Sequence, residues 1–187
     1  MITEGETTQA KIFLTILLIL VSGSCAFAEY EQESAYSILR QGKGHKLIHL
    51  VQVDLIKVET EMEALTKICQ YIAKRYKFIK DMKRIGKKES WTPANEMIER
   101  LTGDCEDWAI LMVSMLRFNT TKPIPSERVW VMCSYEMGHA YVLYQDEDGN
   151  FYTINPSPFK KPQIYIGKLL DPDLIFNDKI AAPTSRL

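Results

Sequence analysis

The spacing of apolar residues changes along the chain, from a helical period in the first half to strand-like runs in the second. Between residues 51 and 80 the apolar positions step by three or four: Val58, Met62, Leu65, Ile68, Ile72, Tyr76 and Ile79. This spacing predicts one long amphipathic helix. Thr92 and Pro93 then suit the N-cap and first residue of a shorter helix that ends near Arg100.

The most apolar stretch covers residues 108–116, where Ser114 is the one polar residue. Asp104 precedes it at the position of a helix N-cap, and Asp107 three residues later completes a carboxylate variant of the capping box. The pattern therefore predicts a helix over Cys105–Arg117. A helix that is apolar nearly all round is expected to be buried.

Downstream of a proline-containing loop the chain becomes rich in β-branched and aromatic residues, which favours strands. The predicted strands cover residues 129–134, 139–145, 150–155 and, less regularly, 163–166. Prolines 156, 158 and 162 are expected to end the regular sheet, and the remainder to wrap the core. Helices first and strands afterwards predict an α+β fold, with the buried helix packed on an antiparallel sheet.

The first 28 residues form a separate compositional unit. Lys11 precedes an apolar run over residues 12–21, and the unit closes with Ala26-Phe27-Ala28. A basic start, an apolar middle and a small-residue end are typical of a secretory signal peptide. The alternative is an uncleaved membrane anchor, since residues 12–28 could cross a bilayer if tilted. We therefore expect a secreted or extracytoplasmic protein, or one tethered by this segment, with residues 29–187 as one domain.

Charge and cysteine content narrow the class of protein. The 187 residues carry a formal net charge of −1, and no basic patch or tail predicts a nucleic-acid partner. Cleavage after Ala28 would leave Cys69, Cys105 and Cys133, an odd number, so at least one thiol stays unbridged. A disulfide between Cys69 and Cys133 is one alternative. We favour the interpretation that Cys69 and Cys133 are reduced and lie in the core.

Cys105 falls at the first position of the predicted buried helix. The helix dipole there favours a thiolate, and the backbone N–H groups can stabilise an oxyanion. The neighbouring carboxylates act in the opposite sense, because like charge raises the pKa of a thiol. A nucleophilic Cys105 therefore needs a cationic partner, most naturally a histidine. The alternative is that Cys105 is a small buried hydrophobic residue.

His139 and Asn155 supply a suitable pair, each at one end of a predicted strand. Along the chain the order is then Cys–His–Asn, in which the thiol attacks, the imidazole holds its proton and the amide orients the ring. His45 and His49 lie near the first long helix with no third metal ligand nearby, and we interpret them as surface or packing residues.

A register argument tests whether His139 and Asn155 can meet. A three-residue hairpin loop, Glu147-Asp148-Gly149, would pair Asp146 with Asn150. That register sets Asn155 opposite Tyr141, on the face of the sheet that His139 shares and diagonal to it. Diagonal neighbours are about 7–8 Å apart at the backbone, within reach of a side-chain hydrogen bond.

Three blocks together resemble the transglutaminase-like cysteine peptidase superfamily: Thr-Gly-Asp-Cys-Glu-Asp-Trp-Ala at 102–109, Met-Gly-His-Ala-Tyr-Val at 137–142 and Phe-Tyr-Thr-Ile-Asn-Pro at 151–156. Trp91-Thr-Pro is similar to a tract that precedes the cysteine in such sequences. The resemblance covers roughly Tyr71 to Pro156 and implies a papain-like fold, in a domain whose core we expect over about residues 51–166. One residue departs from it: the third member is usually Asp, and here the position holds Asn155.

The resemblance also implies a function. It indicates an extracytoplasmic thiol hydrolase that cleaves an amide bond of a protein or peptide through a Cys105–His139–Asn155 triad and a thioester, with Trp91 and Asp104 as candidates for substrate or oxyanion support. The alternatives are an amine-accepting acyltransferase, an inactive binding module on the same fold, and a structural domain with Cys105 in its core.

No cofactor is required by this chemistry, but a metal ion is a further implication. Asp104-Cys105-Glu106 resembles the calcium-dependent bacterial members, in which carboxylates flanking the cysteine ligate the ion. Calcium would also mask the negative charge beside Cys105. The interpretation we prefer is that Asp104 caps the helix and Glu106 is solvated.

Overall fold

The computed structural model describes residues 43–86, 90–134, 137–156, 163–167 and 172–183. Residues 1–28, with the predicted signal peptide or anchor, lie outside this part of the chain. In the described ranges, no helix is both long enough and apolar enough to span a bilayer. The described helices are α3 (Glu61–Arg75), α4 (Asp81–Ile85), α5 (Ala94–Arg100) and α6 (Cys105–Phe118), with 3₁₀ turns at Gly44–Lys46 and Ser126–Arg128.

The helix predicted over residues 51–80 is shorter in the structure, where α3 covers only Glu61–Arg75. Thr60 caps α3 by accepting a hydrogen bond from the backbone of Glu63 at 3.1 Å, so the helix begins only at Glu61. Before it, the Ile56 backbone bonds to the 119–121 segment. After it, Lys77–Phe78 leaves the helix as β1 and pairs in parallel with Thr102–Gly103, which is β2. Tertiary backbone pairing therefore overrides the periodic pattern at both ends.

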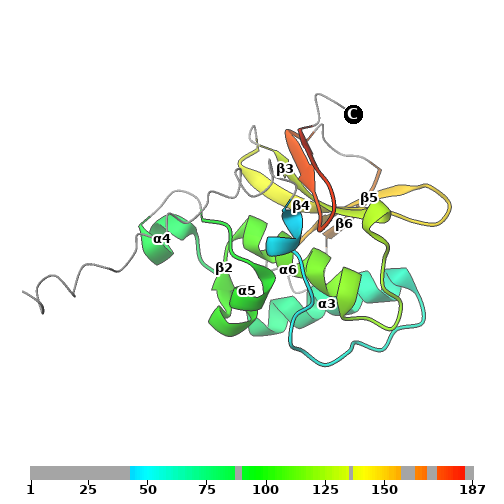
Figure 1. Ribbon diagram of the computed structural model, residues 1–187, viewed down its shortest axis with the longest axis horizontal. Coiled ribbons are helices and arrows are strands. Elements are labelled where there is room, and N and C mark those ends of the chain that lie inside the picture. The colour runs from blue at the N-terminus through cyan, green and yellow to red at the C-terminus, as the bar shows by residue number, and fades with distance from the viewer. Residues whose placement is uncertain (1–42, 87–89, 135–136, 157–162, 168–171, 184–187) are drawn as a thin grey trace, which may run out of the picture. The chain divides into compact units, whose positions relative to one another are not determined.

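Helix α6 confirms the prediction of a central buried helix. It begins at Cys105, as predicted, and residues 106–116 are all buried. It contacts α3 and α5 on one side, and β3 (Val129–Ser134) and β4 (His139–Gln145) on the other. In Figure 1 the three helices lie together below the sheet. The start of α6 is thereby brought against the start of β4.

The sheet confirms the α+β, antiparallel prediction and extends it. Its order is β6-β5-β4-β3-β7-β8, with every neighbouring pair antiparallel. The other strands are β5 (Phe151–Asn155), β6 (Gln163–Ile166), β7 (Leu174–Phe176) and β8 (Ala181–Pro183). The expectation that the prolines end the sheet was wrong. β7 pairs with β3 because Phe176 is fully buried in the core there, which places the late segment inside the sheet.

The hairpin between β4 and β5 has the predicted register. The Asp146 N–H donates to the Asn150 carbonyl at 3.0 Å, and Gly149 takes a positive φ of 86°. Val142 then lies opposite Ile154. Glycine suits this left-handed position, which closes the three-residue loop. The register prediction is confirmed, and His139 and Asn155 share one face of the sheet.

Candidate active site

The thiol of Cys105 lies at the junction of α6 and β4. Its sulfur donates to Glu106 Oε2 at 3.2 Å, and the Ala140 backbone N–H beside it lowers the pKa of the thiol. Burial has the larger effect and raises that pKa well above its ordinary value, and the Glu106 carboxyl raises it further. In this state Cys105 is a protonated thiol, and a nearby base is needed to make it nucleophilic.

His139 is the first residue of β4, directly before Ala140. Its Nε2 lies 3.0 Å from Asn155 Oδ1, at the end of β5. Because an amide oxygen only accepts, this contact requires the proton on Nε2, which leaves Nδ1 as the basic nitrogen. The ring also packs edge-to-face on Tyr141, with centroids 4.6 Å apart. The structure therefore orients the imidazole next to the strand position that contacts Cys105.

The carboxylates around Cys105 do not form the predicted capping box. Asp104 is the N-cap residue of α6, but its side chain makes no capping hydrogen bond and accepts instead from the Asp81 N–H at 3.0 Å. Asp107 accepts from the Thr92 N–H at 2.7 Å. Since α5 begins at Ala94, its N-cap is Pro93 and not the predicted Thr92. Glu106, expected to be solvated, is only 5% exposed. The capping-and-solvation interpretation was wrong on both counts.

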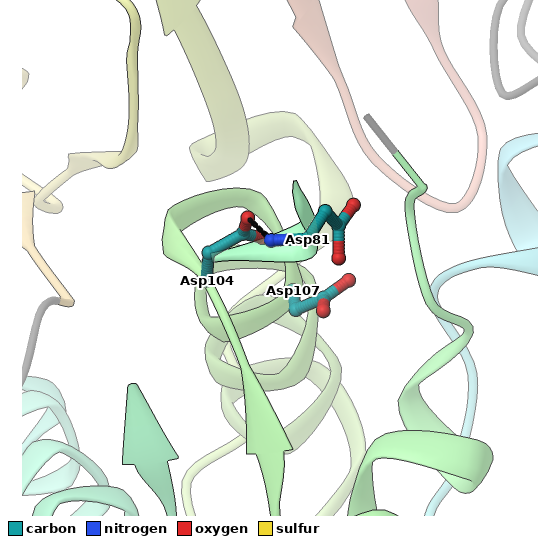
Figure 2. A group of neighbouring side chains, drawn as sticks. All are labelled: Asp81, Asp104 and Asp107. Carbon is teal, nitrogen blue, oxygen red and sulfur yellow. Dashed lines mark hydrogen bonds between the residues drawn. The ribbon is translucent and has the colours of Figure 1, made fainter. Parts of the chain in front are cut away.

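Three of these acidic side chains converge in a buried group. Asp81, Asp104 and Asp107 each offer an oxygen within 4.8 Å of the others (Figure 2). Asp81 comes from α4, 23 residues before Asp104, and no sequence motif pointed to it. Arg84 bonds to Asp81 and lies 3.6 Å from Asp107, while Arg100 approaches Asp107 at 3.9 Å.

With Glu106 beside it, this acidic cluster holds four buried carboxyls against two arginines. Burial is the main cause that raises the pKa of Asp81, of Asp107 to about 6 and of Glu106 to about 9. Within the described residues, one oxygen on each of the four carboxyls lacks a hydrogen-bond partner. Hard carboxyl oxygens that lack a hydrogen-bond partner suit Ca²⁺ as ligands, so the cluster fits the ion.

Comparison with known proteins places this chain in a family. The model of the transglutaminase-like superfamily matches residues 52–154. The chain belongs to the transglutaminase-like superfamily. No curated protein sequence gives a significant match.

Solved structures of Legionella pneumophila LapG share the fold of this transglutaminase-like domain. One is 18% identical and covers 68% of this chain and 71% of its own, with a TM-score of 0.50. A calcium-bound form is 18% identical, with coverages of 69% and 72% and a TM-score of 0.51. An EGTA-treated form is 19% identical, with coverages of 70% and 76% and a TM-score of 0.50.

The remaining predicted site residues lie around this transglutaminase-like core. Trp91 is half-buried and stacks on Phe176, with centroids 5.3 Å apart. Whether Trp91 or Asp104 supports a substrate stays a prediction. His49 contacts the Asn95 side chain at 3.0 Å, which agrees with a packing role.

The two other cysteines of the described chain are core residues, as favoured from the sequence. Neither Cys69 nor Cys133 is in a disulfide, and both are buried. The Cys69 sulfur donates to the sulfur of Met112 at 3.6 Å, and burial raises the pKa of its thiol to about 12. Such a thiol is protonated at neutral pH, and we expect it to be unreactive without a base beside it.

Proposed function

We propose that this transglutaminase-like domain is an extracytoplasmic cysteine hydrolase that cleaves an amide or peptide bond through a thioester on Cys105. Superfamily membership and the likeness to LapG suggest a cysteine hydrolase in general. The observation that carries the finer proposal is the 3.0 Å contact of His139 with Asn155, one residue from the Ala140 N–H beside Cys105.

The first half of the reaction uses the raised pKa of the thiol. Since Cys105 rests protonated, His139 Nδ1 takes its proton as the sulfur attacks the substrate carbonyl carbon. The oxyanion that forms is stabilised by N–H groups at the start of α6, because the first N–H groups of a helix have no acceptor within it. His139 then returns the proton to the departing amine, and the acyl group remains on sulfur as a thioester.

Water completes the cycle. His139 removes a proton from a water molecule, whose oxygen attacks the thioester carbonyl, and the thiolate leaves and regains its proton. The products are a carboxylic acid and the unmodified thiol. Asn155 keeps the imidazole in one tautomer throughout, and as a neutral amide it gives the imidazolium less charge stabilisation than a carboxylate would.

A calcium ion fits this proposal as a structural partner of the site. Asp81, Asp104 and Asp107 would hold it, with Glu106 beside them, because these buried side chains carry oxygens without partners. When bound, calcium supplies positive charge that offsets the excess of carboxylates next to Cys105. LapG has been solved in calcium-bound and EGTA-treated forms.

A labelled peptide library tests the activity. We expect the wild-type chain to release new carboxyl termini, and Cys105→Ala to release none while keeping its fold. Cys133→Ala is the matched control and should stay active. Incorporation of an added primary amine in place of water would make the protein an acyltransferase, and retained peptide binding without turnover would make it a binding module.

The proposed location rests on the sequence of residues 1–28 alone. Fusing this segment to a phosphatase reporter that is active only outside the cytoplasm tests it. Reporter activity is expected, and it should disappear when two apolar residues of the segment 12–21 are replaced by charged ones. An inactive reporter with the unaltered segment would contradict the location and leave the chemistry unaffected.

A further inference from the structure

The third member of the proposed triad creates a requirement that an aspartate would not have. The two oxygens of a carboxylate are equivalent, but the Asn155 amide has a donor end and an acceptor end. With Oδ1 toward His139, the imidazole carries its proton on Nε2 and keeps Nδ1 basic. If the amide turned over, its Nδ2 would face Nε2, the proton would move to Nδ1, and His139 could no longer accept the proton of Cys105.

Strand β6 provides a partner for the donor end of this amide. Gln163 lies directly opposite Asn155 in the antiparallel pairing of β5 with β6. Its Oε1 accepts from Asn155 Nδ2 at 3.4 Å. The same oxygen accepts from the Tyr165 hydroxyl at 3.1 Å. Since side chains two residues apart on a strand share a face, Tyr165 and Gln163 together line the side of the sheet that carries the amide.

We propose that Gln163 is a positioning residue that fixes the direction of the Asn155 amide and thereby the tautomer of His139. This inference rests on the proposed function, because the tautomer matters only if His139 acts as a base. The chain of contacts runs from Tyr165 through Gln163 and Asn155 to the imidazole. Gln163 touches no reacting atom, so its effect on catalysis is expected to reach Cys105 through the ring of His139.

Substitutions at position 163 distinguish the effect of the hydrogen-bond acceptor of Gln163 from the effect of the size of its side chain. Gln163→Glu keeps an acceptor and removes the donor, so it should hold the amide in the same direction. Gln163→Leu keeps the size and removes the acceptor, so the amide can turn. Ile166→Ala, on the same edge strand and 83% exposed, is the matched control for disturbance of the strand.

The tautomer of His139 is read directly by nitrogen-15 NMR of the full chain with labelled histidine. The chain has three histidines, and a His139→Gln variant assigns the signals. We expect a protonated Nε2 in the wild type, in Ile166→Ala and in Gln163→Glu, and a mixture of tautomers in Gln163→Leu. A pure Nε2–H signal in a folded Gln163→Leu would overturn the inference, and this readout does not depend on any hydrolytic activity.

Hydrolysis kinetics of Gln163→Leu, in the wild type and in an Asn155→Asp background, test the same positioning role of Gln163. Loss of one orienting hydrogen bond is expected to lower kcat/KM of Gln163→Leu by about 10-fold, mainly in kcat. With Asn155→Asp, whose carboxylate needs no orientation, the same Gln163→Leu change should cost less than about 2-fold. An equal loss in both backgrounds would show a merely structural role for Gln163. Absence of hydrolysis in every variant, with the NMR result intact, would instead contradict the proposed function.

Discussion

The two ends of α6 differ in how completely the buried charged side chains are hydrogen-bonded. At its start, four carboxyls are buried around Cys105, and each leaves one oxygen without a hydrogen-bond partner in the described structure. At its end, Arg117 donates from Nε and Nη2 to Asp178 at 2.8 and 2.9 Å, and from Nη1 to the Ile124 carbonyl at 2.8 Å. Asn119 closes the same end by donating to the Val51 carbonyl at 2.9 Å.

This difference separates a stabilising end from an end that we propose is reactive. A buried charge whose hydrogen bonds are satisfied holds neighbouring elements together, as Arg117 does between α6 and the loop that carries Asp178. Buried carboxyls with an oxygen that lacks a hydrogen-bond partner cost free energy. We interpret the start of α6 as destabilised in favour of the proposed thiol chemistry and the proposed binding of a cation.

Removing the base at the reactive end should have the largest effect. His139→Ala is expected to lower kcat/KM by about 10²–10⁴-fold, because the buried thiol then loses the imidazole that takes its proton. The half-buried ring contributes little packing, so the melting temperature should hardly change. Peptide hydrolysis and thermal unfolding measure both quantities. His49→Ala is the control and should keep full activity; an equal loss there would contradict the assignment.

Breaking the stabilising end should affect stability and leave the chemistry unchanged. Arg117→Met removes one partner of a mostly buried pair and is expected to lower the free energy of unfolding by about 3 kcal/mol. Denaturant unfolding measures it. The double variant Arg117→Met/Asp178→Leu should recover part of the loss, because no unpaired carboxylate remains. A fall in kcat/KM of the folded single variant would show that the two ends are not independent.

Calcium should stabilise the reactive end, and more so as the pH rises. Protons compete with the ion for carboxyls whose pKa is raised, such as Asp107 at about 6 and Glu106 at about 9. For a dissociation constant on the order of 10 μM, 1 mM calcium adds about 2.7 kcal/mol at pH 8. Calorimetry with calcium or EGTA at pH 8 and 5.5 checks this. Asp81→Asn should weaken the shift; an unchanged shift in that variant would place the ion elsewhere.

The buried Glu106 carboxyl should make the free energy of unfolding depend on pH even without calcium. This effect is smaller than that of calcium, and the raised pKa of Glu106 decides its sign. Its pKa is about 9 in the folded chain and near 4.3 when unfolded, so between these values the folded state binds more protons. The free energy of unfolding therefore falls as the pH rises through this window. In EGTA, we expect the wild type to lose up to about 2.6 kcal/mol more than Glu106→Gln between pH 6 and pH 8. Parallel pH profiles of the two proteins would contradict the raised pKa.

Local patterns carried most of what the sequence could predict. The start of α6 follows from a turn before an apolar run, and the β4–β5 register follows from a three-residue loop that ends in Gly149. Cys105, His139 and Asn155 were found because they fall at the ends of such local elements. The contact of His139 with Asn155 then followed from strand geometry alone.

The rest depends on pairings between distant segments. The Asp104 carboxylate could accept from its own helix or from another backbone, and only the folded chain brings the Asp81 N–H to it. In the same way β7 joins the sheet because Phe176 is buried there, which no local pattern indicated. Gln163 also gains its contact with Asn155 only through the pairing of β6 with β5.

The central claim, that Cys105 is a nucleophile served by His139, is tested most directly by brief alkylation with iodoacetamide and mass-spectrometric mapping. In the chain that begins after Ala28, we expect one label, on Cys105, with Cys69 and Cys133 unmodified because their thiols are buried. Labelling of Cys105 should be at least about 10-fold slower in His139→Ala. The fraction of hydrolytic activity that is lost should equal the fraction of Cys105 that is alkylated. Preferential labelling of Cys69 or Cys133, or full activity after Cys105 is alkylated, would contradict the account.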